Sequence, residues 1–146
     1  MSDYAGAASA IQAAVVAEWT EIPTTYPNAA GFEPPKDVDG VPLPWGLLEV
    51  LPTFSEVLGT GTQKTYAYYG VIVYHVFVPL GTGLAEANRM AVAVGEIFRT
   101  RKLYDNGDGC YVRTVSPSII GSSGNDDNGN WFRVTMTVDF TYWHLI

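Results

Sequence analysis

One stretch near the end of the chain, residues 131–143, alternates apolar and polar side chains without interruption from Phe132 to Tyr142. The apolar set is Phe132, Val134, Met136, Val138, Phe140 and Tyr142, and the polar set is Arg133, Thr135, Thr137, Asp139 and Thr141. Successive side chains of a strand point to opposite faces of its sheet, so this pattern predicts a half-buried strand. Such a strand requires antiparallel neighbours and a layer that covers its apolar face.

A second strand is expected at residues 66–78, where valine, isoleucine, tyrosine and phenylalanine occupy both faces. A strand that is apolar on both faces is either central and covered twice, or presents one face to another subunit. The sequence alone leaves both arrangements open.

The other helices and strands are predicted from the spacing of apolar residues and from the turn residues between them. Helical spacing predicts helices over residues 3–19 and 84–102. Shorter strands are expected at residues 45–54 and 111–120, the second of them weakened by Pro117. The order α-β-β-α-β-β predicts an α+β fold, with a four-stranded, mainly antiparallel sheet and two helices packed on one face.

Three segments are expected to be irregular. Residues 20–44 contain six prolines and are predicted to run extended over the domain. Residues 55–65 are predicted to form a loop, and residues 121–130, rich in Gly, Ser, Asn and Asp, a mobile loop. The length of 146 residues fits a single domain that spans residues 1–146.

Composition limits the class of partner. Charged residues make up 16% of the chain and hydrophobic residues 47%, so we expect apolar surface to be covered by a partner or by copies of the chain. The net charge is −7, and no basic cluster exceeds Arg99, Arg101 and Lys102, so binding to nucleic acid or to a membrane surface is not expected. The chain has one cysteine, Cys110, and no run of 18 apolar residues, so neither an intrachain disulfide nor a membrane span is predicted.

No residue pattern points to catalysis, a cofactor or a metal. The string Gly59–Thr65 lacks the glycine spacing of a phosphate loop. The loop carboxylates lack the spacing of a calcium site; they are Asp105, Asp108, Asp126 and Asp127. The two histidines, His75 and His144, have no acid or nucleophile near them in the sequence. The protein is therefore not expected to be an enzyme.

The tyrosines of the second strand are the candidate interface residues: Tyr66, Tyr68, Tyr69 and Tyr74. Tyrosine offers a large amphipathic contact area at low entropic cost, which suits a contact between proteins. Stacking on nucleic acid bases is not expected, because no basic residues are interleaved with them.

An ordered series of features resembles the tail-terminator family of long-tailed phages and related tail-like particles. The series begins with a short helix that ends near Trp19 and continues with Pro23-Thr-Thr-Tyr-Pro-Asn28. Phe32 with Pro34 and Pro35, then Trp45 at the start of a strand, continue it. It closes with the strand from Gly70 to Val78, a glycine-containing turn and an amphipathic helix.

The resemblance implies a structural protein of the virion with no catalysis, cofactor or metal. Proteins of this family form hexameric rings that cap the head-proximal end of the tail tube, stop its growth and present a surface to the head connector. The implied partners are further copies of the chain, the tube protein and a head-completion protein, and DNA passes through without specific binding. Assembly would take place in the host cytoplasm. The alternatives are another neck or tail component, such as a head-closure or tube-like protein, or a small ligand-binding or enzymatic α+β domain outside phages.

Overall fold

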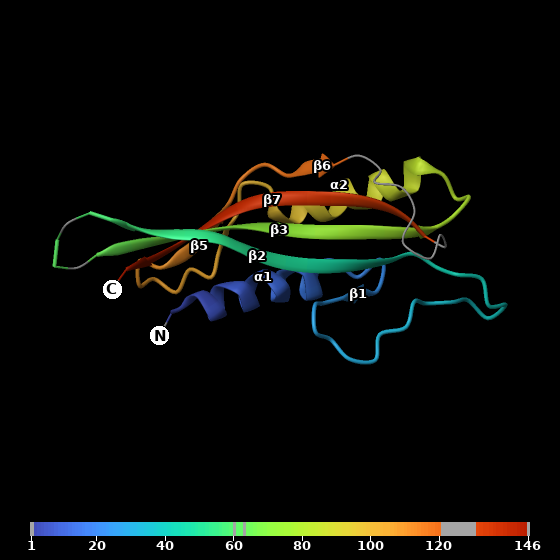
Figure 1. The fold of residues 1–146 in the computed structure, drawn as a ribbon, viewed down its shortest axis with the longest axis horizontal. Coiled ribbons are helices and arrows are strands. Elements are labelled where there is room, and N and C mark those ends of the chain that lie inside the picture. Colours follow the sequence, from blue (N-terminus) through green and yellow to red (C-terminus); the bar gives the residue numbers. More distant parts are fainter. Residues whose placement is uncertain (1, 60, 63, 121–130, 146) are drawn as a thin grey trace.

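The computed structural model describes residues 2–59, 61–62, 64–120 and 131–145, and shows two helices packed against one mixed sheet (Figure 1). The helices are α1 (Tyr4–Glu18) and α2 (Leu84–Phe98). The strands are β1 (Thr24–Thr25), β2 (Trp45–Leu58), β3 (Thr65–Pro79), β4 (Lys102–Leu103), β5 (Tyr111–Thr114), β6 (Ser118–Ile120) and β7 (Trp131–Leu145).

The predicted α+β class is confirmed, but the prediction of a four-stranded, mainly antiparallel sheet is wrong. Seven strands form the sheet in the order β1-β2-β3-β7-β5-β4, and β6 pairs with β7. It is mixed because β1 runs parallel to β2. Strands of two residues, such as β1 and β4, are too short to show a period in the sequence. Pro117 divides the predicted strand 111–120 into β5 and β6.

The alternating pattern of β7 matches its burial. Val134, Met136 and Val138 are buried, as is Phe140, whereas Asp139 on the opposite face is exposed. β7 pairs antiparallel with β3 over the whole of both strands, from Thr65↔Leu145 to Pro79↔Trp131. β3 is therefore central, with β2 on its other side.

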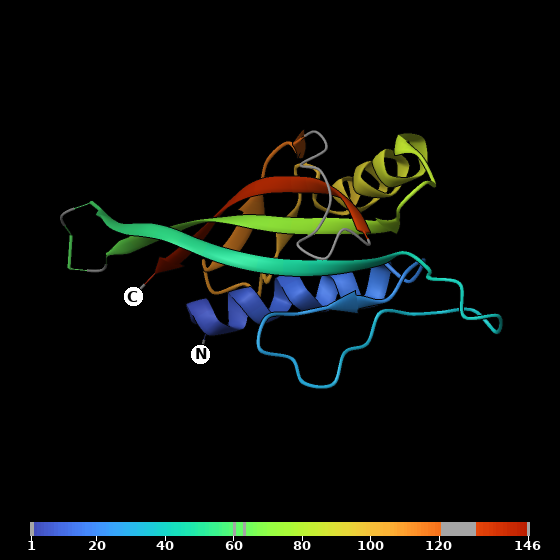
Figure 2. The ribbon, with the colours of Figure 1, turned by 45° about the vertical axis from the view of Figure 1, so that its right-hand side comes forward.

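Both helices lie on one face of the sheet, as predicted (Figure 2). The Asp3 side chain caps α1 by accepting a hydrogen bond from the Gly6 amide at 2.7 Å. The other helix ends at Phe98 rather than at the predicted residue 102, because Thr100 has a φ of 44° and the chain turns into β4. Neither helix is long and apolar enough to cross a membrane among the described residues.

Tyr74 lies at the centre of the core between these layers. Its hydroxyl accepts a hydrogen bond from Trp19 Nε1 at 2.9 Å and lies 2.7 Å from Thr24 Oγ1. Burial raises the pKa of Tyr74 to about 12. Gly46 makes room for this ring, because a Cβ there would lie 2.0 Å from the Tyr74 hydroxyl oxygen. These contacts tie α1 and β1 to the centre of the sheet.

The predicted loop at residues 55–65 is wrong in most of its length. β2 continues to Leu58 and β3 begins at Thr65, so the two strands form one long hairpin. Its far end projects beyond the helices (Figure 1). The register shifts between Pro52 and Phe54, opposite Gly70, where a Cβ would lie 2.7 Å from the Leu51 carbonyl oxygen. We call residues 51–58 with residues 65–69 the arm.

The proline-rich segment 20–44 has only β1 and an isolated bridge between Lys36 and Pro42 as regular pairing. The predicted mobile loop 121–130 lies outside the described residues.

A pair of tyrosine substitutions tests the position of Tyr74. Tyr74→Phe leaves the buried Trp19 indole N–H without its acceptor, so the free energy of unfolding should fall by about 1–3 kcal/mol. Tyr69→Phe removes an exposed hydroxyl and should leave stability nearly unchanged. Urea denaturation followed by tryptophan fluorescence measures both. Equal losses in the two variants would contradict the central role of the Tyr74 hydroxyl.

Candidate interaction surface

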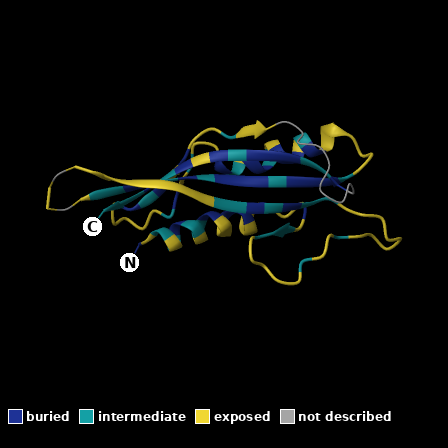
Figure 3. Cartoon of the chain, in the orientation of Figure 1, coloured by how far each residue is buried: buried dark blue, intermediate teal, exposed yellow. Residues whose placement is uncertain are grey.

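The arm carries large apolar side chains that the subunit does not cover. Every residue from Leu51 to Leu58 is exposed (Figure 3). Phe54 is 60% exposed and Val57 51% exposed. Exposed apolar side chains that gather on one element mark an interaction site more often than scattered ones do. The arm is therefore the leading candidate for contact with another protein chain.

An aromatic pair stiffens the arm on the face of the sheet that points away from the helices. The rings of Phe54 and Tyr69 stack with their centroids 4.6 Å apart. The Tyr69 hydroxyl donates a hydrogen bond to Glu56 Oε1 at 2.6 Å, and this bond raises the pKa of Tyr69. Because these side chains already hold one another, little rotamer freedom remains to be lost when a partner binds.

A shallow hollow of about 270 Å³ lies beside this pair. Phe54 and Tyr69 form one side of it, and Val115, Asp139 and Thr141 form the other. It joins the arm to the loop between β5 and β6 across the uncovered face of β3 and β7.

The structure places the four candidate tyrosines in different environments. Tyr69 lies on the arm at the candidate surface, and Tyr66 is half-buried on the arm opposite Val57. Tyr68 packs inside the subunit, with its ring 5.7 Å from that of Tyr4 and 5.9 Å from that of Tyr142. Tyr74 is fully buried, so its ring cannot reach another subunit.

Sequence analysis missed Phe54 and Val57, which are more exposed than the two leucines of the arm, Leu51 and Leu58. The alternation along β2 changes phase at the bulge between Pro52 and Phe54. A bulge places an extra residue in one strand and interrupts the period of two. The remaining signal, an apolar pair at residues 57–58 before Gly59, is short but points to a continuing strand.

The structure brings His75 together with two polar side chains that are distant in the sequence. Its Nδ1 lies 2.8 Å from Thr135 Oγ1 and its Nε2 lies 3.1 Å from Glu49 Oε1. Burial lowers the pKa of His75, and Arg133 adds to this effect while Glu49 opposes it. The neutral ring then donates from Nε2 to the carboxylate and accepts from the threonine hydroxyl.

A threonine, a histidine and an acid in this order resemble the groups of a nucleophile, a base and an orienting acid. Thr135 is only 7% exposed, however, and lies on a strand interior. A nucleophile must be open to its substrate. We assign this trio a structural role: it satisfies polar groups on the face of the sheet that the helices leave uncovered.

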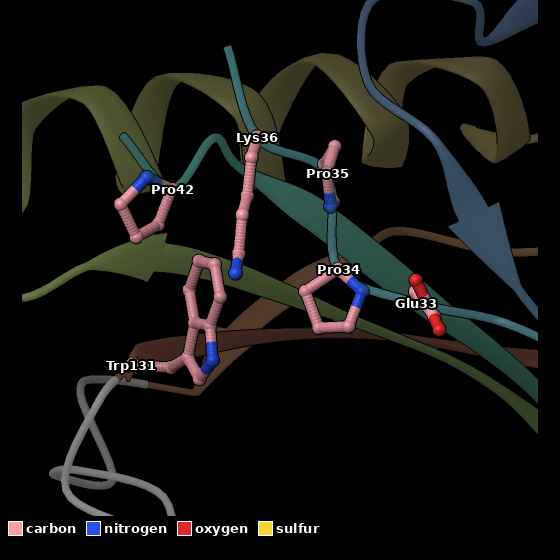
Figure 4. Close-up of a pocket in the computed structure, with 6 residues that line it drawn as sticks. All are labelled: Glu33, Pro34, Pro35, Lys36, Pro42 and Trp131. Carbon is pink, nitrogen blue, oxygen red and sulfur yellow. The ribbon is translucent and has the colours of Figure 1, made fainter. Parts of the chain in front are cut away.

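A larger pocket of about 810 Å³ lies at the opposite end of the sheet from the arm. The proline-rich segment and the start of β7 line it with Glu33, Pro34, Pro35, Lys36, Pro42 and Trp131 (Figure 4). The Lys36 side chain extends toward the Trp131 ring (Figure 4). Trp45 stacks on Phe77 at 4.2 Å beside Trp131 and anchors this end of the sheet.

The carboxylates of the described loop accept hydrogen bonds from nearby backbone amides, as is typical of aspartates in turns. Asp105 accepts from the Gly107 amide at 3.1 Å and Asp108 accepts from the Cys110 amide at 2.9 Å. The bond from Gly107 lowers the pKa of the Asp105 carboxyl. A hydrogen bond from the Ser2 hydroxyl, followed by the bond from Cys110, lowers the pKa of the Asp108 carboxyl. Asp126 and Asp127 lie outside the described residues. Within the described ranges, no three His, Cys, Asp or Glu side chains gather as a metal site would require.

Comparison with known proteins gives a family match over most of the chain. A sequence profile described as phage tail terminator protein matches residues 7–140. One solved structure is 19% identical in sequence, with a TM-score of 0.60 over 90% of this chain and 92% of that chain. This likeness shows a shared fold. No curated protein sequence matches the chain.

The position of His75 predicts a pH dependence of stability. Because its folded-state pKa lies below the ordinary value of about 6.5, the unfolded chain binds the proton first as the pH falls. The free energy of unfolding should therefore decrease from pH 7 toward pH 5.5, and His75→Gln should flatten this slope. Urea denaturation at a series of pH values measures both. A wild-type stability that rises over this interval would contradict the assignment.

Proposed function

Because this chain belongs to the phage tail terminator family, we propose that it forms a hexameric ring that caps the head-proximal end of a phage tail tube. The ring stops polymerisation of the tube and offers the surface to which the head is joined. Its partners are further copies of the chain, the tube protein and a head-completion protein. The protein is made in the host cytoplasm and is then part of the virion.

The exposed arm is the observation that carries the proposal beyond the family. A subunit that worked alone would leave Leu51, Phe54 and Val57 in water on a projecting element. Burial of apolar surface contributes roughly 25 cal/mol for each Å², so a contact that covers the arm is a substantial source of assembly free energy. A ring repeats each contact around its symmetry axis, which multiplies the gain.

The charge of the chain suits a conduit for DNA. Each subunit carries a formal charge of −7, and six subunits in a ring add their fields. Such an assembly repels the phosphate backbone, so DNA can pass through the ring without being retained.

Native mass spectrometry of the purified protein tests the ring and the part that the arm plays in it. The wild-type chain should give a six-subunit species. Phe54→Ser should raise the concentration at which half of the subunits are assembled by about tenfold or more, because a central aromatic contact is worth about 2 kcal/mol. At concentrations where both proteins are monomeric, the thermal melt of the variant should match that of the wild type closely, since the Phe54 side chain is 60% exposed in the subunit.

Val38→Ser is the matched control, because Val38 is fully exposed on the proline-rich segment rather than on the arm. It should assemble as the wild type does. A wild-type protein that stays monomeric or dimeric at all concentrations would overturn the ring. Equal weakening of assembly by both variants would show that the arm does not form the contact between subunits.

A further inference from the structure

One edge of the sheet is open along the arm. β1 covers β2 only at Gly46 and Leu47, and no described strand pairs with that side of β2 from Leu48 to Leu58. Its unpaired backbone groups form a template for a strand of another chain. Proteins protect such edges with charged residues or by covering them. Here the only charged residue between Leu51 and Leu58 is Glu56.

On the opposite side of the sheet, β6 pairs with β7, and no other strand of the described residues pairs with β6 (Figures 1 and 2). All three residues of β6 are exposed, and Ile120 is 53% exposed. Val115, in the connection from β5, is 50% exposed. Both edges thus have backbone groups that no described strand pairs with, and apolar side chains that are exposed to solvent.

The charges of the two edges are complementary. Residues 45–58 contain two glutamates and no lysine or arginine. Residues 113–120 contain one cation, Arg113, and no acidic residue. Arg113, on β5, is exposed and makes no ion pair with the residues that the structure describes. Opposite charges on two surfaces favour their encounter and set their orientation.

We propose that the arm edge of one copy of this chain, residues 51–58, docks against the β6 edge of the next copy, residues 118–120, next to the exposed Val115 and Arg113. The inference rests on the proposed ring and names the surfaces that join its subunits. A strand added to an open edge gains main-chain hydrogen bonds, and the side chains on both strands supply the specificity.

The arrangement is head-to-tail rather than two-fold. Each copy offers the arm with Glu56 on one side and, on the other, the β6 edge with Arg113 on the preceding strand, so every subunit can bind two neighbours in the same way. A contact between two different surfaces closes into a ring when the rotation between copies is right. An arm that met another arm would place two copies of Glu56 in the same contact, where like charges repel.

Cross-linking between two exposed serines tests the contact. Ser55 lies on the arm and Ser118 lies on β6, and both are exposed. In a Cys110→Ala background, the double variant Ser55→Cys with Ser118→Cys should be cross-linked by a short bis-maleimide. The products should form a ladder on a denaturing gel, from the dimer up to the six-subunit species. The yield should exceed by at least tenfold that of the control pair Ser55→Cys with Ser9→Cys, whose second residue is exposed on α1.

The single variants separate the possible contacts, with native mass spectrometry of each variant as the companion measurement. Neither Ser55→Cys nor Ser118→Cys alone should give a ladder. Dimers from Ser55→Cys alone would show arm-to-arm pairing and overturn the inference. A six-subunit ring in which the double variant gives no ladder would also overturn it, while the proposed function stands. Absence of any ring would remove the proposed function and this contact together.

Discussion

The pairing of β3 with β7 supports the rest of the subunit. The two strands form an antiparallel ladder from Thr65↔Leu145 to Pro79↔Trp131 without a break in register. Every second residue of each strand therefore points toward the two helices, and Ile72, Tyr74, Val134 and Val138 form the centre of the core. A slip of one residue would turn these side chains to the other face, so the hydrophobic pattern fixes the register.

This ladder also determines what the subunit leaves open. Both helices pack on one face, so the other face carries the Phe54–Tyr69 pair, the His75 trio and the aromatic cluster of Trp45. β2 and β3 extend past the region that the helices cover and continue as the arm. A fold with a long hairpin and two open edges has surface to offer to copies of itself, which is the basis of the proposed ring. The family match supplies the phage tail setting.

The parts of the fold that were predictable from sequence are those with a sustained period. Residues 132–142 alternate over most of a strand, and residues 84–98 keep a helical stripe, so both elements and the buried face of β7 were identified, although the helix was expected to extend to residue 102. β1 and β4 are two residues long, which is too short for an alternating pattern, so the predicted sheet had too few strands. The bulge at Pro52 interrupts the alternation of β2, so the continuation of this strand into the arm and the exposure of Phe54 were not predicted. Tyr74 and Tyr69 look alike in the sequence, and only the phase of β3 against the helices shows that one is buried and the other faces the hollow beside the arm.

The most direct test of the proposed role in the tail is electron microscopy of a lysate from a phage that lacks this protein. A ring that stops the tube and receives the head should, when absent, leave tails of irregular and excessive length that are not joined to heads. Tails of normal length attached to full heads would contradict the account. Tails of correct length that remain unjoined would contradict its tube-stopping part and point to a protein of the neck.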